Sequence, residues 1–124
     1  MFSYGIYERW DASSKSVPKI KKYTTEIPAE IDIEFGYVLK INKAKGKKLH
    51  YTIKHPPFND KFGKPAGDFT GIEHINKNIY EFYLGDTIWH PIEDKCGDWT
   101  LICKLDGREI GRKTFKITNT DQPE

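Results

Sequence analysis

The chain has 124 residues, the size of one ordinary domain, and it is long enough to bury a core without metal or disulfide crosslinks. Charged residues make up 31% of the sequence with both signs mixed, and the net charge of +2 excludes the strongly basic composition of a dedicated nucleic-acid-binding protein. No apolar run approaches membrane-spanning length, and the N-terminus lacks the basic and apolar regions of a signal peptide. We therefore expect a cytoplasmic protein, with a mature secreted chain as the alternative. Residues 1–118 are expected to form one domain, followed by a polar tail at 119–124.

Alternating apolar residues predict β-strands through the first part of the chain. Phe2–Trp10 alternates with one break, and Lys19–Thr25 reads as a short polar strand whose lysines suit a sheet edge. The segment Ile27–Ala29 is expected to be a connector. The strictest alternation is in Ile31–Ile41, where every odd residue is apolar, and Gly36 in its middle predicts a bulge or bend.

The middle of the chain predicts a hairpin followed by a long irregular stretch. Leu49–Ile53 alternates and forms the second hairpin strand after the turn Asn42–Gly46. Residues 56–71 are too rich in Pro, Gly and Asp for a regular element. A β-like pattern resumes over 72–84 with a kink near Asn76–Asn78, and Thr87–Trp89 is a further short strand.

The segment from Gly97 to Ile117 predicts a tight hairpin. Asp106-Gly107 is a dipeptide that closes a two-residue turn, because both central residues of that turn need a positive φ. Across such a turn Cys103 faces Ile110, yet the apolar residues nearer the end of the second strand have the opposite parity. One extra residue must be absorbed, and Gly111 is the expected bulge site.

These segments amount to about eight strands at the turn spacing of a β-sandwich, with no helical periodicity of useful length. Residues that share a parity within each strand are expected to face inward. The predicted core consists of Ile31, Ile33, Phe35, Tyr37, Leu39, Leu49, Tyr51, Ile53, Trp99, Leu101, Cys103 and Phe115.

The two cysteines are predicted to be free thiols. Cys96 and Cys103 lie on or beside one strand, and seven extended residues at about 3.3 Å each separate them by roughly 23 Å, far beyond disulfide reach. Free thiols favour a reducing compartment.

The chain lacks a recognisable catalytic or metal-binding motif. His50, His55, His74 and His90 form no known ligand spacing, and the histidines before proline suit turns. No nucleophile elbow and no phosphate-binding glycine loop is present. We therefore expect no cofactor and no metal, and an enzyme is the third choice among the functions considered.

Two segments are candidate binding sites. The first is aromatic: Phe58, Phe62 and Phe69 of the long loop, with Trp89 nearby in the chain. These rings either line a ligand groove or cover one end of the core, and the second use is commoner. The second is the basic turn, with Lys43, Lys45, Lys47 and Lys48, which either contacts an acidic partner or is a solvated face, again the commoner case.

Several short motifs occur in the order of a known family. They are YGIYE at Tyr4–Glu8, IPAEIDIEFGYVLKI at Ile27–Ile41, HPP after the second hairpin strand, and the closing GDWTL, LDG and TFKI. With these motifs the chain resembles the bacterial domain-of-unknown-function family 3859 over most of its length. The resemblance implies an all-β, immunoglobulin-like antiparallel sandwich of about seven or eight strands. It implies no catalytic residues, because the family has no established activity to carry over.

The functional expectation is a non-catalytic binding or interaction module whose partner is a protein or a second copy of the chain. Immunoglobulin-like domains work through loops at one end or through a sheet face. The alternative is a sandwich that holds a carbohydrate or small ligand with the aromatic loop. No specific nucleic-acid binding and no membrane insertion are expected.

Overall fold

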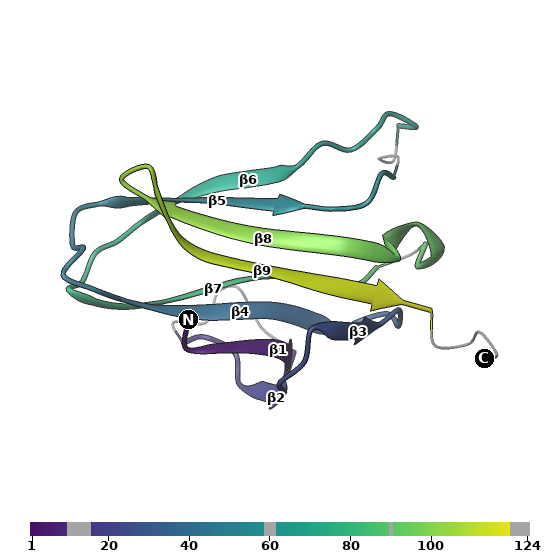
Figure 1. The fold of residues 1–124 in the computed structure, drawn as a ribbon, viewed down its shortest axis with the longest axis horizontal. Helices are drawn as coiled ribbons and strands as arrows, with labels where there is room; N and C mark the ends of the chain where they lie inside the picture. Colours follow the sequence, from purple (N-terminus) through teal and green to yellow (C-terminus); the bar gives the residue numbers. More distant parts are fainter. Residues whose placement is uncertain (10–15, 59–61, 90, 120–124) are drawn as a thin grey trace.

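The protein is a sandwich of two β-sheets, seen edge-on in Figure 1, in a computed structural model that describes residues 1–9, 16–58, 62–89 and 91–119. The four-stranded sheet has the order β2-β1-β4-β7 and the five-stranded sheet the order β3-β9-β8-β5-β6. The elements are β1 (Ser3–Tyr7), β2 (Ile20–Lys22), β3 (Glu26–Pro28), β4 (Glu34–Asn42), β5 (Lys48–Lys54), β6 (Phe69–His74), β7 (Ile79–Thr87), the short 3-10 helix η1 (Glu93–Lys95), β8 (Gly97–Leu105) and β9 (Arg108–Thr118). The predicted strand end at Trp10, the turn predicted at His90 and the predicted polar tail from residue 120 onward lie outside the described residues.

The predicted all-β class is confirmed, with one strand that the sequence pattern missed. Ile27–Ala29 was expected to be a connector, but Glu26–Pro28 forms β3, which pairs in parallel with the end of β9. Ile27 is fully buried there. A three-residue strand is too short to show a period, and its partner lies far away in the sequence, so local pattern could not reveal it.

The predicted kink near Asn76–Asn78 is a crossover between the two sheets. β6 pairs with β5 in one sheet and β7 pairs with β4 in the other. Ile75 is buried at the crossover, and its amide donates to the carbonyl of Lys47. The strand predicted at Thr87–Trp89 is wrong, because Thr87 is the last residue of β7 and the chain then leaves the sheet.

β4 begins later than its sequence pattern suggested. Asp32 has a φ of +69° in a turn, so Ile31 lies outside the strand and is 40% exposed, and its assignment to the core is wrong. Val38 breaks the alternation because the outer face of β4 is also covered. It packs there with Tyr7 and Tyr83 in a second, smaller apolar cluster.

The core lies between the sheets and contains nearly all of the remaining predicted residues. Phe35, Tyr37, Leu39, Leu49, Ile53, Trp99, Leu101, Cys103 and Phe115 are buried, while Ile33 and Tyr51 are partly buried against them. Tyr37 links the two layers, because its hydroxyl donates to the Leu101 carbonyl at 3.1 Å. Burial raises the pKa of this hydroxyl far above the ordinary tyrosine range.

The C-terminal hairpin forms as predicted, with the bulge one residue earlier. Asp106 and Gly107 have φ values of +52° and +76°, as the two-residue turn requires. Glu109 pairs with Lys104 and Gly111 pairs with Cys103, so Ile110 is the extra residue.

Gly36 marks a close approach of strands, and the bulge or bend expected there is absent from the described pairing. Gly5, Gly36 and Gly85 form a continuous row across β1, β4 and β7. A Cβ on Gly36 would lie 2.2 Å from the carbonyl oxygen of Leu84. The glycine is therefore required because backbone, not a movable side chain, occupies the space.

Candidate functional site

The two predicted binding segments lie at opposite ends of the sandwich (Figure 1). The aromatic loop after β5 lies at the same end as η1, whereas the turn between β4 and β5 lies with the β8–β9 turn at the other end. One compact binding surface therefore cannot include both segments.

At the first end, three of the four predicted aromatic residues come together. The Phe58 ring centroid lies 5.8 Å from that of Trp89 and 6.3 Å from that of Phe69. Trp99, which is fully buried, forms the floor, with its ring 6.1 Å from Trp89. Phe62 differs from the others, because 76% of its surface is exposed.

A buried lysine, which sequence reasoning did not single out, anchors this cluster. The Lys95 ammonium lies 4.5 Å from the ring centroids of both Phe58 and Trp89, and the side chain is only 1% exposed. It donates hydrogen bonds to the Pro91 carbonyl at 3.1 Å and to the Asp94 carboxylate at 2.5 Å. The charge is thus balanced by an anion, a carbonyl dipole and two ring faces.

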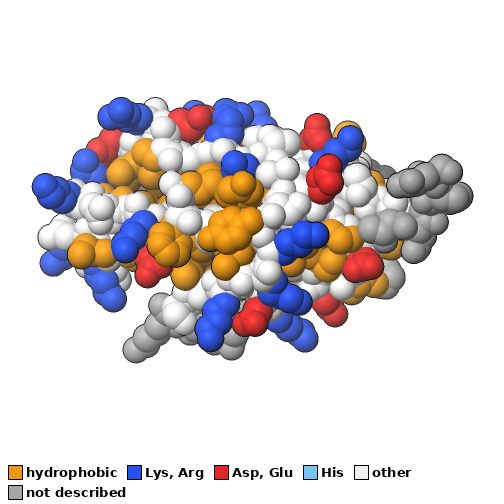
Figure 2. Space-filling view, turned by 60° about the horizontal axis from the view of Figure 1, so that its bottom comes forward, with side chains coloured by type: hydrophobic (Ala, Val, Ile, Leu, Met, Phe, Trp, Pro, Cys, Tyr) orange, Lys and Arg blue, Asp and Glu red, His pale blue; other side chains and the backbone are white. Residues whose placement is uncertain are grey.

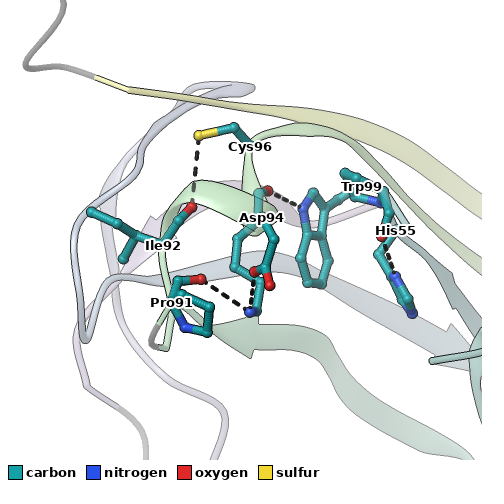
Figure 3. Close-up of polar contacts among 8 residues, drawn as sticks. His55, Pro91, Ile92, Asp94, Cys96 and Trp99 are labelled. Carbon is teal, nitrogen blue, oxygen red and sulfur yellow. Dashed lines mark hydrogen bonds and ion pairs between the residues drawn. The ribbon is translucent and has the colours of Figure 1, made fainter. Parts of the chain in front are cut away.

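The turn that carries Lys95 is also fixed by its backbone (Figure 3). The indole of Trp99 donates to the Lys95 carbonyl at 2.8 Å, and the Cys96 thiol lies 3.8 Å from the Ile92 carbonyl. Lys95 is therefore held at both its side chain and its main chain. No sequence motif signals this arrangement, because the lysine faces inward only in the folded turn.

His55 lies beside the aromatic cluster and is hydrogen-bonded through both ring nitrogens. Nδ1 is 2.8 Å from the carbonyl oxygen of Pro56 and Nε2 is 2.7 Å from that of Gly67. Its ring packs on Phe58 and Phe69, with centroid distances of 4.4 and 4.7 Å. The expected role of this histidine in local turn chemistry accounts for its contact with Pro56.

Asp86, near the end of β7, is the carboxyl most affected by this environment. Burial raises the pKa of Asp86 to about 6, and the negative charge of Glu34 acts in the same direction. The hydrogen bond from the Thr87 amide, at 2.8 Å, and the positive charges of His55 and Lys95 oppose the rise. The sequence offered no signal for this residue.

At the opposite end, the predicted basic residues are exposed but not all are free. Lys43, Lys45, Lys47 and Lys48 are all exposed on the β4–β5 turn. Lys47 forms an ion pair with Asp106 of the β8–β9 turn at 2.8 Å. A shallow, open depression between the two turns is lined by Gly46, Lys47, Lys48, His50, Asp106 and Gly107.

A third surface, which the sequence did not reveal, lies on the side of β1 and β2. Met1, Phe2 and Tyr23 are 50%, 61% and 59% exposed, and Tyr23 packs edge-on against Tyr4 with ring centroids 5.7 Å apart. Figure 2 turns this side forward and shows apolar side chains gathered across the middle of the face, with Lys and Arg side chains around them. We call Met1, Phe2, Tyr4 and Tyr23 the β1 face.

Two lysines lie on the rings of the β1 face. The Lys113 ammonium is 4.1 Å from the ring centroid of Tyr4, and the Lys40 ammonium is 5.8 Å from that of Phe2. Lys113 comes from β9 and Lys40 from β4, so both sheets contribute to this surface. The face therefore combines exposed rings with positive charge.

Neither a metal site nor a membrane-spanning helix is found in the part of the chain that the structure describes. No group of three or more His, Cys, Asp and Glu side chains there is placed to hold a metal ion. None of the described helices is long and apolar enough to span a membrane.

Comparison with known proteins places the chain in a family. The model of the family described as "Domain of unknown function (DUF3859)" matches residues 1–117. The chain belongs to this family. The fold of this DUF3859 domain is similar to the crystal structure of an immunoglobulin-like protein from Pseudomonas aeruginosa, with a TM-score of 0.74, 20% identity, and coverage of 94% of this chain and 90% of that one. No match was found among curated proteins.

These comparisons confirm the predicted family and the immunoglobulin-like sandwich. At 20% identity the structural likeness concerns the fold alone. Which surface of the DUF3859 domain acts, and on what, must therefore be argued from its own residues.

Proposed function

We propose that this domain is a non-catalytic binding module that docks a protein partner through the β1 face. The observation that carries the proposal is the exposure of Phe2 and Tyr23 beside Tyr4. Soluble monomers rarely leave aromatic side chains grouped in this way unless the surface binds something. Tyr4 belongs to a strand paired with β4, so the surface is preorganised and little ordering entropy is lost on docking.

The charge around the face indicates the chemistry of the partner. Lys40 and Lys113 lie over the rings of Phe2 and Tyr4, and each can turn outward to a carboxylate at the margin. The complementary surface has an apolar centre and Asp or Glu side chains at its rim. Such charges mainly increase the association rate and the specificity, while the rings supply the binding energy.

Two of the ionisable groups at the aromatic end, His55 and Lys95, support a non-catalytic role. Both nitrogens of His55 face backbone carbonyls, and the Lys95 ammonium is enclosed by Asp94, Pro91 and two rings. A general base must reach the proton that it abstracts, and these groups are already engaged in holding the turn and the loop. We also propose a cytoplasmic location, which the two free thiols support because they favour a reducing compartment.

Substitutions on the three surfaces separate the candidates. Phe2→Ala with Tyr23→Ala should lower recovery of a partner, captured by a photo-crosslinker near the β1 face, by at least about tenfold. Phe62→Ala and the pair Lys45→Glu with Lys47→Glu are the controls, and each should leave capture unchanged. All of these side chains are exposed, so each variant should change the unfolding free energy by about 1 kcal/mol or less, and for the lysine pair this range includes the loss of the Lys47–Asp106 ion pair.

Other results would redirect the proposal. If only the lysine pair abolishes capture, the basic turn is the binding surface and the β1 face is not. Sedimentation of the same variants distinguishes the occupants, because loss of a dimer in Phe2→Ala with Tyr23→Ala would identify the partner as a second copy.

The second candidate is carbohydrate or small-ligand binding at the aromatic end. It is favoured by the exposure of Trp89 next to the anchored rings of Phe58 and Phe69, with the exposed Phe62 on the same loop as Phe58. Sugar rings stack on such side chains. A glycan array probed with wild type and Phe62→Ala tests it, with Phe2→Ala as the matched control; binding that survives Phe62→Ala would argue against this site.

A further inference from the structure

The inner face of β1 is covered less completely than its outer face. Tyr4 pairs with the core residue Tyr37, so its side chain points between the sheets, yet it is only partly buried. Phe2 has the same parity and is 61% exposed. Ser3 and Tyr7 point to the outer face, and both are buried. The five-stranded sheet therefore leaves the inner face of β1 open where the rings of the β1 face lie.

The opening exists because β3 covers only the last part of β9. β9 begins at Arg108, but β3 pairs with it only over Lys116–Thr118, and Figure 1 shows β3 beside this end. The Lys116 amide donates to the Thr25 carbonyl, which lies just before β3. Tyr23, two residues earlier, already packs on β1 in the other sheet. The first part of β9 therefore borders the β1 face without a strand on that side in the described part of the chain.

Two residues of β9 direct backbone groups along this edge. In an antiparallel pair, successive residues bond alternately toward and away from the partner strand. The amide of Lys116 bonds to Thr25, so Lys116 points away from β8. Pairing with β8 is regular from Gly111 onward, so Thr114 and Arg112 point the same way. No described backbone group bonds to either of them on that side.

The charge beside this edge is positive and unpaired. The Lys113 ammonium lies 4.1 Å from the ring centroid of Tyr4, and the Lys40 ammonium lies 5.8 Å from that of Phe2. Neither lysine forms an ion pair with a described carboxylate. A chain that enters this space can therefore place Asp or Glu side chains against both ammonium groups, which favours an acidic segment over a basic one.

We propose that an extended, acidic and apolar segment of the partner protein adds to the five-stranded sheet as a strand along β9, in line with β3, and covers Tyr4 and Phe2. Main-chain hydrogen bonds to Arg112 and Thr114 hold the segment, and its alternate side chains pack on the rings. About four residues, at about 3.3 Å each, span this stretch of β9.

The strand addition rests on the proposed docking at the β1 face and specifies its geometry. β6 and β7 also end their sheets, but they lie at the opposite ends of the strand orders from β3 and β2. Only the β9 edge combines open backbone groups with the exposed rings and the two lysines of the β1 face.

The test uses a displayed library of random peptides of about nine residues, roughly 30 Å when extended, selected against the full chain. Enriched peptides should alternate apolar residues with Asp or Glu. Amide exchange of the wild type is then measured with and without a selected peptide. The Arg112 and Thr114 amides should become protected at least about tenfold, whereas the Phe115 amide, which faces β8, should be protected in both samples.

Two substitutions at Thr114 isolate the backbone contribution. Thr114→Pro removes the amide that points to the edge and leaves the bonds to β8, and proline is tolerated at such positions. It should weaken peptide binding about tenfold or more. Thr114→Val keeps the amide and loses only the hydroxyl contact with Thr100, so it should bind about tenfold more tightly than Thr114→Pro.

The outcomes separate this proposal from the proposed function. If Phe2→Ala with Tyr23→Ala abolishes peptide binding but the Arg112 and Thr114 amides stay unprotected in the wild-type complex, the face binds through side chains alone and the strand addition is wrong. Peptides that respond to neither the face variant nor Thr114→Pro bind elsewhere and count against both proposals.

Two other results would also overturn the strand addition. One is a selection that enriches no peptide. The other is self-association that protects the Arg112 and Thr114 amides without peptide, because the added strand would then come from a second copy. The exchange measurement uses the wild type, so it gives an answer even if Thr114→Pro fails to fold.

Discussion

Replacing Lys95 with methionine isolates the contribution of its charge. Methionine keeps an unbranched, flexible apolar stem of similar length, so the contacts of the lysine methylenes are largely retained. What is lost is the ammonium, with its hydrogen bonds to Pro91 and Asp94 and its contacts with the faces of Phe58 and Trp89. The substitution therefore tests electrostatics rather than packing.

The expected loss follows from the exposure of the two partners. Removing one member of a fully buried ion pair costs about 3–5 kcal/mol, because the other charge is stranded. Asp94 is 33% exposed and can regain water, which reduces this cost, while Lys95 no longer has to be desolvated. The lost ring contacts add about 1–2 kcal/mol. We expect Lys95→Met to lower the unfolding free energy by about 2 kcal/mol, equivalent to roughly 8 °C in Tm for a chain of this size.

Urea unfolding followed by tryptophan fluorescence measures this loss directly. Asp94→Asn is the comparison variant, because its amide oxygen can still accept from Lys95 but the buried ammonium loses its balancing anion, so a loss of about 1–3 kcal/mol is expected. The double variant should show a coupling of about 1 kcal/mol. If Lys95→Met is as stable as the wild type or more stable, the desolvation cost of the ammonium equals or exceeds its interactions, and the charge does not hold the aromatic end together.

Three further predictions concern the core and its titrating groups. Burial raises the pKa of Asp86 to about 6, so the protonated carboxyl contributes to the free energy of unfolding fully below about pH 4, and this contribution is lost as the pH rises through 6. Asp86→Asn should remove this pH-dependent loss, which is at most about 3 kcal/mol. If urea unfolding at several pH values gives the same pH dependence for the wild type and Asp86→Asn, the prediction is wrong. Gly36→Ala should cost about 3 kcal/mol or more, since the new Cβ meets backbone at 2.2 Å, whereas a loss below about 1 kcal/mol would mean that the strands can separate. Cys103 is buried and its thiol pKa is raised to about 11, so a thiol reagent should label Cys96 in the folded protein and Cys103 only after unfolding; absence of free thiol in a denatured, unreduced sample would reveal a bridge.

Period-two patterns located most of the core from the sequence alone. Side chains alternate between the faces of a strand, so the parity of Phe35, Leu101 and Phe115 was enough to direct them inward. The Asp106-Gly107 turn was also legible, because few dipeptides accept two positive φ values. Both signals are local, and neither depends on which strand becomes the neighbour.

The failures share a physical cause, which is that pairing and coverage depend on distant parts of the chain. Ile31 fits the alternation of β4, yet a turn at Asp32 places it outside the strand. β3 exists because the end of β9 offers it a partner, and Ile27 is buried as a result.

For the candidate sites too, the sequence identified some of the residues, but only the structure shows which of them are in contact. Composition identified Phe58, Phe69 and Trp89 as candidates, because aromatic residues in a long loop need either an anchor or a ligand. It could not show that the ammonium of Lys95 lies between Phe58 and Trp89, since an isolated lysine carries no sign of being buried. Nor could it show that Tyr4 and Tyr23 meet on one face. Sequence determined which side chains of most strands face the core. Tertiary structure decided which outer faces are covered and which side chains share a surface, because that depends on how strands distant in the chain are ordered within and between the two sheets.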